Sequence, residues 1–331
     1  MRRMQRSALD DDDNTGVVGG DTSGSDDDGH VLEATLEHPK VLLNLIRSIR
    51  LRRKRATLHI SAEGLKFISD EDKWIQAVAL LERQLFKQFD FNGAAGRDGG
   101  GGGDDLDENP RGGGGDDGGG SSSSFCRFEV SLDHLEQCLN LFGSASASLC
   151  TVKLVYPGRD NSFVLFVSDD SSAFSECELA TFVCDESAVE EQSLQDRADN
   201  AVVARVLFNS DLLKEIWAEM DQTASLLKLS ITADRLALAT PTMKVEVGKQ
   251  SDAIVQFERS GERSQEDVNY NMKILRATQK ALNLSHKTLV RLADDGTLAL
   301  QFRLKADDTS DCYVEFFCRA LETLDDESAL L

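Results

Sequence analysis

The 331-residue chain lacks most of the patterns that indicate a membrane protein, a zinc site or a disulfide framework. No apolar run approaches the roughly 18–20 residues of a membrane-spanning helix. The first residues contain no apolar stretch of the kind a secretory signal needs. The five histidines never occur as H-x-x-x-H, and the seven cysteines never form a C-x-x-C pair. We therefore expect reduced thiols, no metal site and no membrane association.

Signs of a nucleotide or cofactor site are also missing. The chain has only four prolines and contains no G-x-x-x-x-G-K-[ST] motif. Its two glycine runs, at 99–103 and 112–120, are separated by aspartates, and such an acidic stretch would repel phosphate rather than bind it. We expect no cofactor, and we interpret 93–124 as a disordered insertion.

The charge is strongly acidic but unevenly distributed. The chain has 36 basic and 58 acidic residues, which gives a net charge of −22. Four low-complexity or terminal segments, 1–30, 93–124, 184–200 and 321–331, together carry −19 of that charge. The remainder is close to neutral, so the acidic composition does not exclude a nucleic-acid partner.

The rest of the sequence reads as four similar units of helix, strand, turn and strand. In the first helix, Val41, Leu42, Leu45, Ile46 and Ile49 share one face. In the second, Asp133 and Glu136 have the spacing of a capping box. The spacing of apolar residues predicts helices at 39–50, 133–142, 211–220 and 272–284.

Two of these units share sequence, which indicates internal duplication. The hairpin at Ile60–Phe67 aligns with the one at Ile231–Leu238. We therefore predict an acidic N-terminal tail, two domains of two units each, a connector between them and an acidic C-terminal tail. The predicted bounds are 1–30, 31–183 (with the insertion 93–124), 184–200, 201–320 and 321–331.

Several stretches spread over residues 31–320 carry a family resemblance. They are Ile60–Phe67, Gln84–Phe91, Leu139–Ser144, Leu213–Asp221 and Cys312–Cys318. With these stretches the sequence resembles the sliding clamps of the PCNA superfamily, and more closely the Rad-one subunits of the nine-one-one checkpoint clamp. The acidic N-terminal tail and the long insertion at 93–124 depart from the family.

The resemblance implies an α+β sliding-clamp fold, with two pseudo-repeated domains that each pack two helices on curved antiparallel sheets. It implies a nuclear heterotrimer with two other clamp-like subunits, placed by a clamp loader around double-stranded DNA without sequence preference. Such a ring would serve as a platform for checkpoint kinases and repair factors. A homotrimeric replication clamp is the alternative that shares this fold.

A 3′–5′ exonuclease is a further alternative, because that label occurs in the family. Two-metal chemistry needs several carboxylates that converge on ions about 3.5–4 Å apart. The paired acids at 169–170, 294–295 and 307–308 instead lie where hairpin turns are predicted. We expect no catalytic residue and no enzyme activity.

In the family the helices line the hole, so basic residues on the predicted helices are candidates for contact with phosphates. Ordinary solvent-facing positions are the alternative for each of them. The candidates are Lys40, Arg47, Arg50, Lys214, Lys273, Arg276 and Lys280. The run Arg50–Arg55 could contact DNA, act as a nuclear import signal or form a solvated loop.

The resemblance also implies that the ring closes through edge strands, here expected at 175–182 and 243–247. Pairing of these strands within their own sheets is the alternative. The candidate interface residues are Cys177, Leu179, Thr181, Lys244 and Val245. The connector 184–200 would flank a groove for partner peptides, whose lining residues the sequence does not identify.

Overall fold

A computed structural model shows the arrangement of most of the chain. It describes residues 29–71, 73–93, 125–141, 150–169, 174–184, 194–200, 202–221, 223–260, 267–306 and 310–321. Most of the segments predicted to be disordered, namely 1–28, 94–124 and 322–331, lie outside the described residues, as does 185–193 of the connector.

The first half of the chain supplies strands β1 to β9 together with helices α1 and α2. Their bounds are β1 (Leu32–Leu36), α1 (Pro39–Ser48), β2 (Arg55–Ser61), β3 (Gly64–Glu71), β4 (Ile75–Glu82), the 3-10 turn η1 (Arg83–Leu85), β5 (Gln88–Phe91), β6 (Cys126–Ser131), α2 (Leu132–Leu139), β7 (Cys150–Tyr156), the 3-10 turn η3 (Arg159–Asn161), β8 (Phe163–Asp169) and β9 (Phe174–Leu179).

A short helix in the connector leads to the second half, which supplies β10 to β18. The bounds are α3 (Leu194–Asn200), β10 (Val202–Asn209), α4 (Ser210–Glu219), β11 (Leu226–Ile231), β12 (Arg235–Ala239), β13 (Lys244–Gly248), β14 (Ile254–Arg259), β15 (Val268–Asn271), α5 (Met272–Leu275), the 3-10 turn η5 (Arg276–Thr278), α6 (Gln279–Leu284), β16 (Ser285–Ala293), β17 (Leu298–Lys305) and β18 (Asp311–Cys318).

The predicted helices form where apolar side chains recur at helical spacing. All five residues of the apolar stripe on α1 are buried, and Pro39 occupies the first turn, where its missing N–H costs no helical hydrogen bond. The predicted helix 272–284 is α5, η5 and α6 in direct succession. Within it the Thr278 hydroxyl donates to the Leu275 carbonyl at 2.7 Å, a local bond that favours the tighter 3-10 turn.

The strands form three antiparallel sheets. The first half builds a five-stranded sheet with the order β5-β1-β7-β8-β9. The second half builds a four-stranded sheet with the order β13-β12-β11-β15. A nine-stranded sheet, β14-β10-β16-β17-β18-β4-β3-β2-β6, contains strands of both halves.

The two halves have the same order of elements among the described residues. Each runs strand, helix, five strands, helical segment, three strands. Their sheets correspond as well, because β5-β1-β7-β8-β9 matches β14-β10-β16-β17-β18, and β4-β3-β2-β6 matches β13-β12-β11-β15. The duplication indicated by one pair of hairpins thus extends over both halves.

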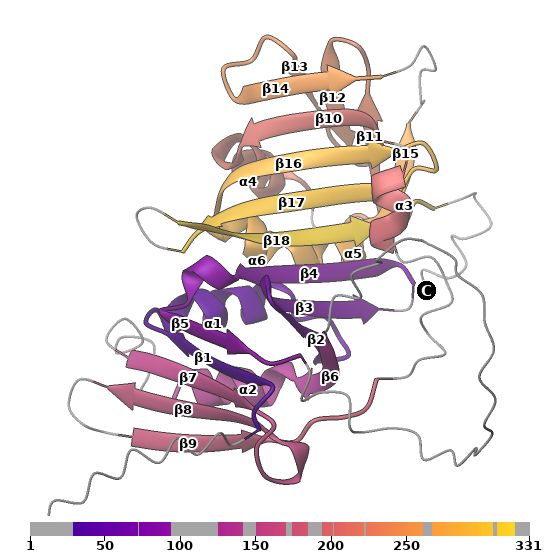
Figure 1. Cartoon of the computed structure of the whole chain (residues 1–331). Coiled ribbons are helices and arrows are strands. Elements are labelled where there is room, and N and C mark those ends of the chain that lie inside the picture. Colours follow the sequence, from indigo (N-terminus) through magenta and orange to yellow (C-terminus); the bar gives the residue numbers. More distant parts are fainter. Residues whose placement is uncertain are drawn as a thin grey trace, which may run out of the picture.

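The halves meet where β18 pairs with β4 in antiparallel register, from Tyr313 opposite Leu80 to Cys318 opposite Ile75. One apolar core continues across this junction, since its buried residues come from both halves. In Figure 1 the strands run in a long stack from β14 to β9, with α1, α2, α4, α5 and α6 behind the sheets and α3 in front.

Candidate nucleic-acid face and sheet edges

The helices other than α3 form a continuous row on one face of the sheets. Helix α1 contacts α2 on one side and α6 on the other, and α6 contacts α4. All seven predicted DNA-facing residues lie in or directly after helical elements of this row. They are Lys40 and Arg47 in α1, Arg50 just after it, Lys214 in α4, Lys273 in α5, Arg276 in η5 and Lys280 in α6.

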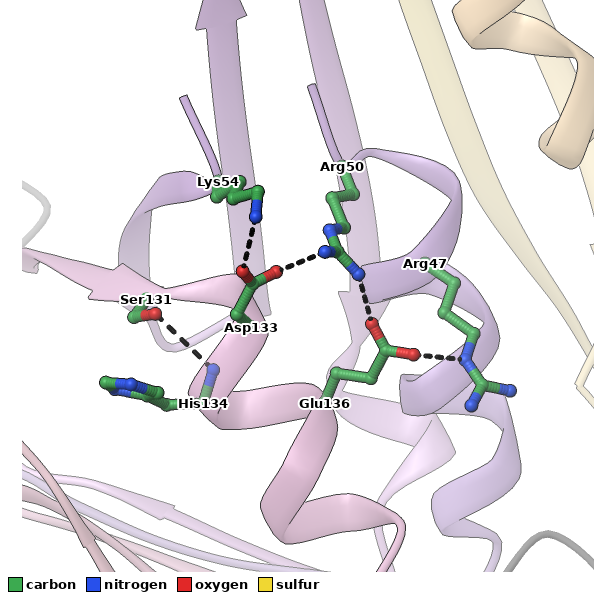
Figure 2. Close-up of polar contacts among 7 residues, drawn as sticks. All are labelled: Arg47, Arg50, Lys54, Ser131, Asp133, His134 and Glu136. Carbon is green, nitrogen blue, oxygen red and sulfur yellow. Dashed lines mark hydrogen bonds and ion pairs between the residues drawn. The ribbon is translucent and has the colours of Figure 1, made fainter. Parts of the chain in front are cut away.

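Two of these residues are held by carboxylates on the neighbouring helix α2, as Figure 2 shows. Arg47 Nε donates to Glu136 at 2.8 Å, and Arg50 donates to the other oxygen of Glu136 at 2.8 Å. Arg50 also contacts Asp133 at 2.7 Å, and Lys54 reaches the same carboxylate at 3.1 Å. These five residues, which we call the α1–α2 ion cluster, tie the two helices together.

The ion cluster corrects the predicted role of Asp133 and Glu136, which do not form a capping box. The residue that caps α2 is Ser131, whose hydroxyl accepts from the backbone N–H of His134 at 3.4 Å (Figure 2). The two acids are therefore free to face α1, where they offset two of the cluster's three positive charges. Sequence reasoning missed this role because the partners are more than 80 positions apart.

The basic residues of α5 and α6 are placed differently. Lys273 and Lys280 are exposed, whereas Arg276 is half-buried and its Nε is enclosed without a hydrogen-bond partner among the described residues. Lys40 is exposed at the start of α1. Lys214 pairs with Asp211 on its own helix at 3.1 Å. Lys40, Lys273 and Lys280 therefore present the most accessible positive charge of the seven.

The basic run Arg50–Arg55 leads from the end of α1 into β2. Every basic side chain in it has a carboxylate partner within 4 Å: Arg50 with Asp133 and Glu136, Arg52 with Glu71, Arg53 with Asp70, Lys54 with Asp133 and Arg55 with Glu129. The basic side chains of residues 52–55 are 52–80% exposed, so solvent screens their pairs, and each contributes on the order of 0–1 kcal/mol. None of the three interpretations of this run is tested by its position.

Both predicted partner strands are edge strands. Strand β9 ends the five-stranded sheet, and β13 ends the four-stranded sheet. Residues 180–182 continue past β9, where Phe182 forms a bridge with Glu129 of β6. Thr181 has its hydroxyl bonded to the Asn161 carbonyl at 2.7 Å. Each edge strand thus has a partner on one side within the described residues.

The side chains of the predicted interface residues do not all face the open edges. Cys177 and Val245 pack against the apolar core, and Leu179 is buried. Lys244 is exposed and pairs with Glu246 at 2.7 Å. Strand edges pair through backbone groups, so Cys177, Leu179 and Val245 could contribute to pairing only through their backbone.

The backbone groups of β13 that face its open edge can be deduced from the hydrogen bonds on either side. Thr240 N donates to Met243 O at 2.8 Å and Lys249 N to Asp234 O at 2.6 Å. Antiparallel pairs alternate between bonded and non-bonded. Counting inward from these two bonded pairs, Ala237 and Glu246 form a non-bonded pair. Glu246 therefore directs its N–H away from β12.

The connector helix α3, which sequence reasoning missed, lies on the opposite face of the nine-stranded sheet from the helix row. Its Ala198 is buried against Val78, Ala299 and Phe317. Arg291 of β16 bonds both Asp199 of α3 and Glu315 of β18. Burial raises the pKa of Glu315, and the adjacent guanidinium opposes that rise. Its apolar side chains, Leu194 and Ala198, lie only one turn apart, which is too short a pattern to predict a helix from the sequence of 184–200.

The described residues contain neither a metal-binding cluster nor a membrane-spanning helix. No group of three or more His, Cys, Asp or Glu side chains is placed to hold a metal ion there. Asp295, one of the predicted turn acids, accepts from the backbone N–H and the hydroxyl of Thr297, which is turn chemistry. The acids at 170, 307 and 308 lie outside the described residues. No described helix is long and apolar enough to cross a membrane.

The arrangement of paired repeats, with helices on one face and sheets on the other, defines a sliding-clamp fold. A crystal structure of PCNA from Thermococcus kodakaraensis matches with a TM-score of 0.61 and 13% identity, covering 88% of this chain and all of that one. A PCNA structure from Entamoeba histolytica matches with the same TM-score and identity, over 88% of this chain and 99% of that one.

The family follows from the sequence comparison. The family described as "Repair protein Rad1/Rec1/Rad17" matches residues 31–304, and the chain belongs to it. The human "Cell cycle checkpoint protein RAD1" is 24% identical over 302 residues, covering 88% of this chain and 93% of the relative. The Schizosaccharomyces pombe "DNA damage checkpoint control protein rad1" is 20% identical over 298 residues, with 83% and 82% covered.

Proposed function

We propose that this chain is one subunit of a heterotrimeric ring that encircles double-stranded DNA in the DNA-damage checkpoint. In this role it acts in the nucleus as a non-catalytic platform for checkpoint kinases and repair factors, after a clamp loader has placed the ring on DNA. The checkpoint assignment is supported by the family and by the names of its relatives in human and fission yeast.

One observation supports assembly into a ring. The strand pairing that joins the two halves of the chain, which we call the seam, is equivalent to the pairing that the chain would form with its neighbours. Within the chain, β18 of the second half pairs with β4 of the first. By the repeat, β9 corresponds to β18 and β13 corresponds to β4, and both are edge strands. The edge of β9 on one subunit would therefore pair with the edge equivalent to β13 on the next subunit, as β18 pairs with β4 within the chain. Such head-to-tail contacts close into rings when the rotation per subunit permits.

The helix row supports the DNA contact. Where β18 meets β4, α6 contacts α1 beneath the seam, so repeating the seam around a ring would continue the row of helices along one face. Lys40, Lys273 and Lys280 are exposed on that row, as contacts with phosphates require. Phosphate contacts position a protein without reading sequence, which suits a ring that moves along DNA.

A homotrimeric replication clamp uses the same seam, because β9 and β13 of identical copies could pair. Native mass spectrometry of the full chain, purified from its own cells, separates the two. We expect one copy of this chain with two different clamp-like chains. Three identical copies would establish the homotrimer instead. A monomer with magnesium-dependent 3′–5′ exonuclease activity would contradict both ring assignments.

A further inference from the structure

Two cysteines from different elements lie in contact. Cys138 is in the last turn of α2, and Cys177 is in the edge strand β9. The two elements pack against each other, and the two thiols are hydrogen-bonded. Both side chains border the apolar core and both are partly exposed, unlike the buried thiols of Cys150, Cys312 and Cys318. The pair is thus close enough to react and accessible to small molecules.

The alternation of β9 explains why its cysteine reaches the helix. Residues 175, 177 and 179 turn toward the core side of the strand, whereas Phe174, Glu176 and Glu178 are exposed on the other side. Cys177 therefore lies on the side of β9 that packs against α2, where it stays partly exposed, while the open edge of β9 is formed by backbone groups. Pairing of that edge with another strand would not use the thiol.

We propose that Cys138 and Cys177 form a reversible disulfide that links helix α2 to the edge strand β9. The oxidant is a small disulfide such as oxidised glutathione. In the first exchange the Cys177 sulfur bonds to one glutathione sulfur, and the other glutathione leaves as a thiol. In the second, the Cys138 sulfur attacks Cys177, the bond between Cys177 and glutathione breaks, and the second glutathione leaves as a thiol.

The order of the two exchanges follows from the surroundings of Cys138. Burial, followed by the contact with Cys177, raises the pKa of Cys138 to about 12. Cys138 is therefore protonated at neutral pH and is a poor first nucleophile, since the thiolate is the reactive form. The Cys177 thiol no longer raises the pKa of Cys138 once Cys177 is oxidised. The attack of Cys138 on Cys177 is then also intramolecular, which favours the second exchange.

The link would restrain the strand through which the chain is proposed to join its neighbour, and this consequence alone rests on the proposed function. Disulfides in reducing compartments are usually transient and redox-sensing rather than structural. A pair that joins a helix to an edge strand has that character, because it forms and breaks without rearranging the core. The chemistry itself can be measured on the single chain, whatever its assembly.

The test equilibrates the full chain in buffers of increasing oxidised-to-reduced glutathione ratio, followed by acid quenching, alkylation and peptide mapping. We expect a peptide linked through Cys138 and Cys177, at least about tenfold more abundant than any link between Cys126 and Cys184, which also lie close enough to interact. The link should disappear at the reducing end. Absence of the linked peptide throughout, or equal amounts of both links, would overturn the proposal.

Two serine variants test the order of reaction. Cys138→Ser should retain glutathione on Cys177, because the resolving thiol is gone. Cys177→Ser should leave Cys138 mostly as a free thiol. Glutathione on Cys138 in the Cys177→Ser variant, at a level equal to that on Cys177 in Cys138→Ser, would contradict the assigned order. Far-ultraviolet circular dichroism of both variants checks that they fold, and the wild-type mapping decides the proposal if either does not.

Discussion

At the scale of single residues, Glu136 is the charged side chain that connects α2 to two arginines of the helix row. Its two oxygens accept from Arg47 and Arg50, which belong to a different helical segment. The carboxylate side chain is 21% exposed, so solvent screens these pairs only in part. Glu136 therefore ties α2 to α1 and engages two guanidinium groups that stay about one third exposed.

Replacing Glu136 with Gln should destabilise the chain. The substitution keeps the shape but removes the charge that two arginines share, and we expect the free energy of unfolding to fall by about 1 kcal/mol. The urea midpoint of the isolated chain measures this effect. Asp211→Asn is the matched control, because the Asp211 side chain is 86% exposed in its pair with Lys214 and should change the midpoint little. Equal effects of the two variants would contradict the structural role of the ion cluster.

The residue scale also shows what the sequence could predict. The apolar stripe of α1 is buried as predicted, because helical periodicity is a local property. The partners of Arg47 and Arg50 could not be predicted, since Asp133 and Glu136 lie far away in the sequence and meet them only after α1 and α2 have packed. Local spacing instead suggested a capping role for the same acids, and Ser131 has that role.

At the scale of elements, the open edge of β13 is the feature through which the proposed assembly can be tested most directly. Its Glu246 N–H faces away from β12, while Val245 and Val247 bond inward by the antiparallel alternation. A proline is tolerated in an edge strand where the missing N–H faces outward. The chain can therefore be altered at this edge without loss of its own sheet.

Glu246→Pro should weaken assembly of the ring while leaving the isolated chain folded. The loss of an outward donor and the added ring both oppose pairing, and we expect affinity for the neighbouring subunit to fall at least about tenfold, or about 1.4 kcal/mol. Sedimentation of the reconstituted complex measures this. Glu246→Ala controls for the lost ion pairs with Arg235 and Lys244, which are exposed and should matter little. An intact ring with the proline variant would falsify the β13 seam.

The sequence predicts the helices and hairpins with clear periodicity better than it predicts short polar segments. The helices and the hairpins that follow them show clear periodicity, and they are confirmed, although α1 ends at Ser48 rather than at residue 50 and α2 at Leu139 rather than at residue 142. Helix α3 was not predicted, because it is short and mostly polar, and it packs on the sheet through Leu194, Ala198 and the ion pair of Asp199. Tertiary contacts decide such segments, and a single sequence does not contain them.

At the scale of the whole molecule, positive charge reaches the helix face mainly through Lys40, Lys273 and Lys280. Of the basic residues predicted from sequence, Arg47 and Arg50 are instead engaged by Glu136. The face is thus less basic than the sequence suggests, and weak, mobile attachment to phosphates is what we expect of it.

Replacing Lys273 and Lys280 with Ala should weaken binding of the assembled ring to duplex DNA and reduce its dependence on salt. Loss of two phosphate contacts would lower the slope of log K against log salt by about 2. Fluorescence anisotropy at several salt concentrations measures both quantities. The control is Lys153→Ala with Lys228→Ala, which removes the same charge from strands of the two sheets, where each lysine pairs with an acid. Identical slopes for the two double variants would remove Lys273 and Lys280 from the DNA-facing set.

The join between the two halves has a mechanical consequence for how such a ring could be loaded. Inside the chain, the β18–β4 seam is reinforced by a continuous apolar core, by the covalent connector and by α3, which contacts strands of both halves. A seam between chains would have strand pairing and helix contacts but no covalent tether. If a loader opens the proposed ring to admit DNA, the gap should therefore form between chains, and each chain should move as a single stiff arc.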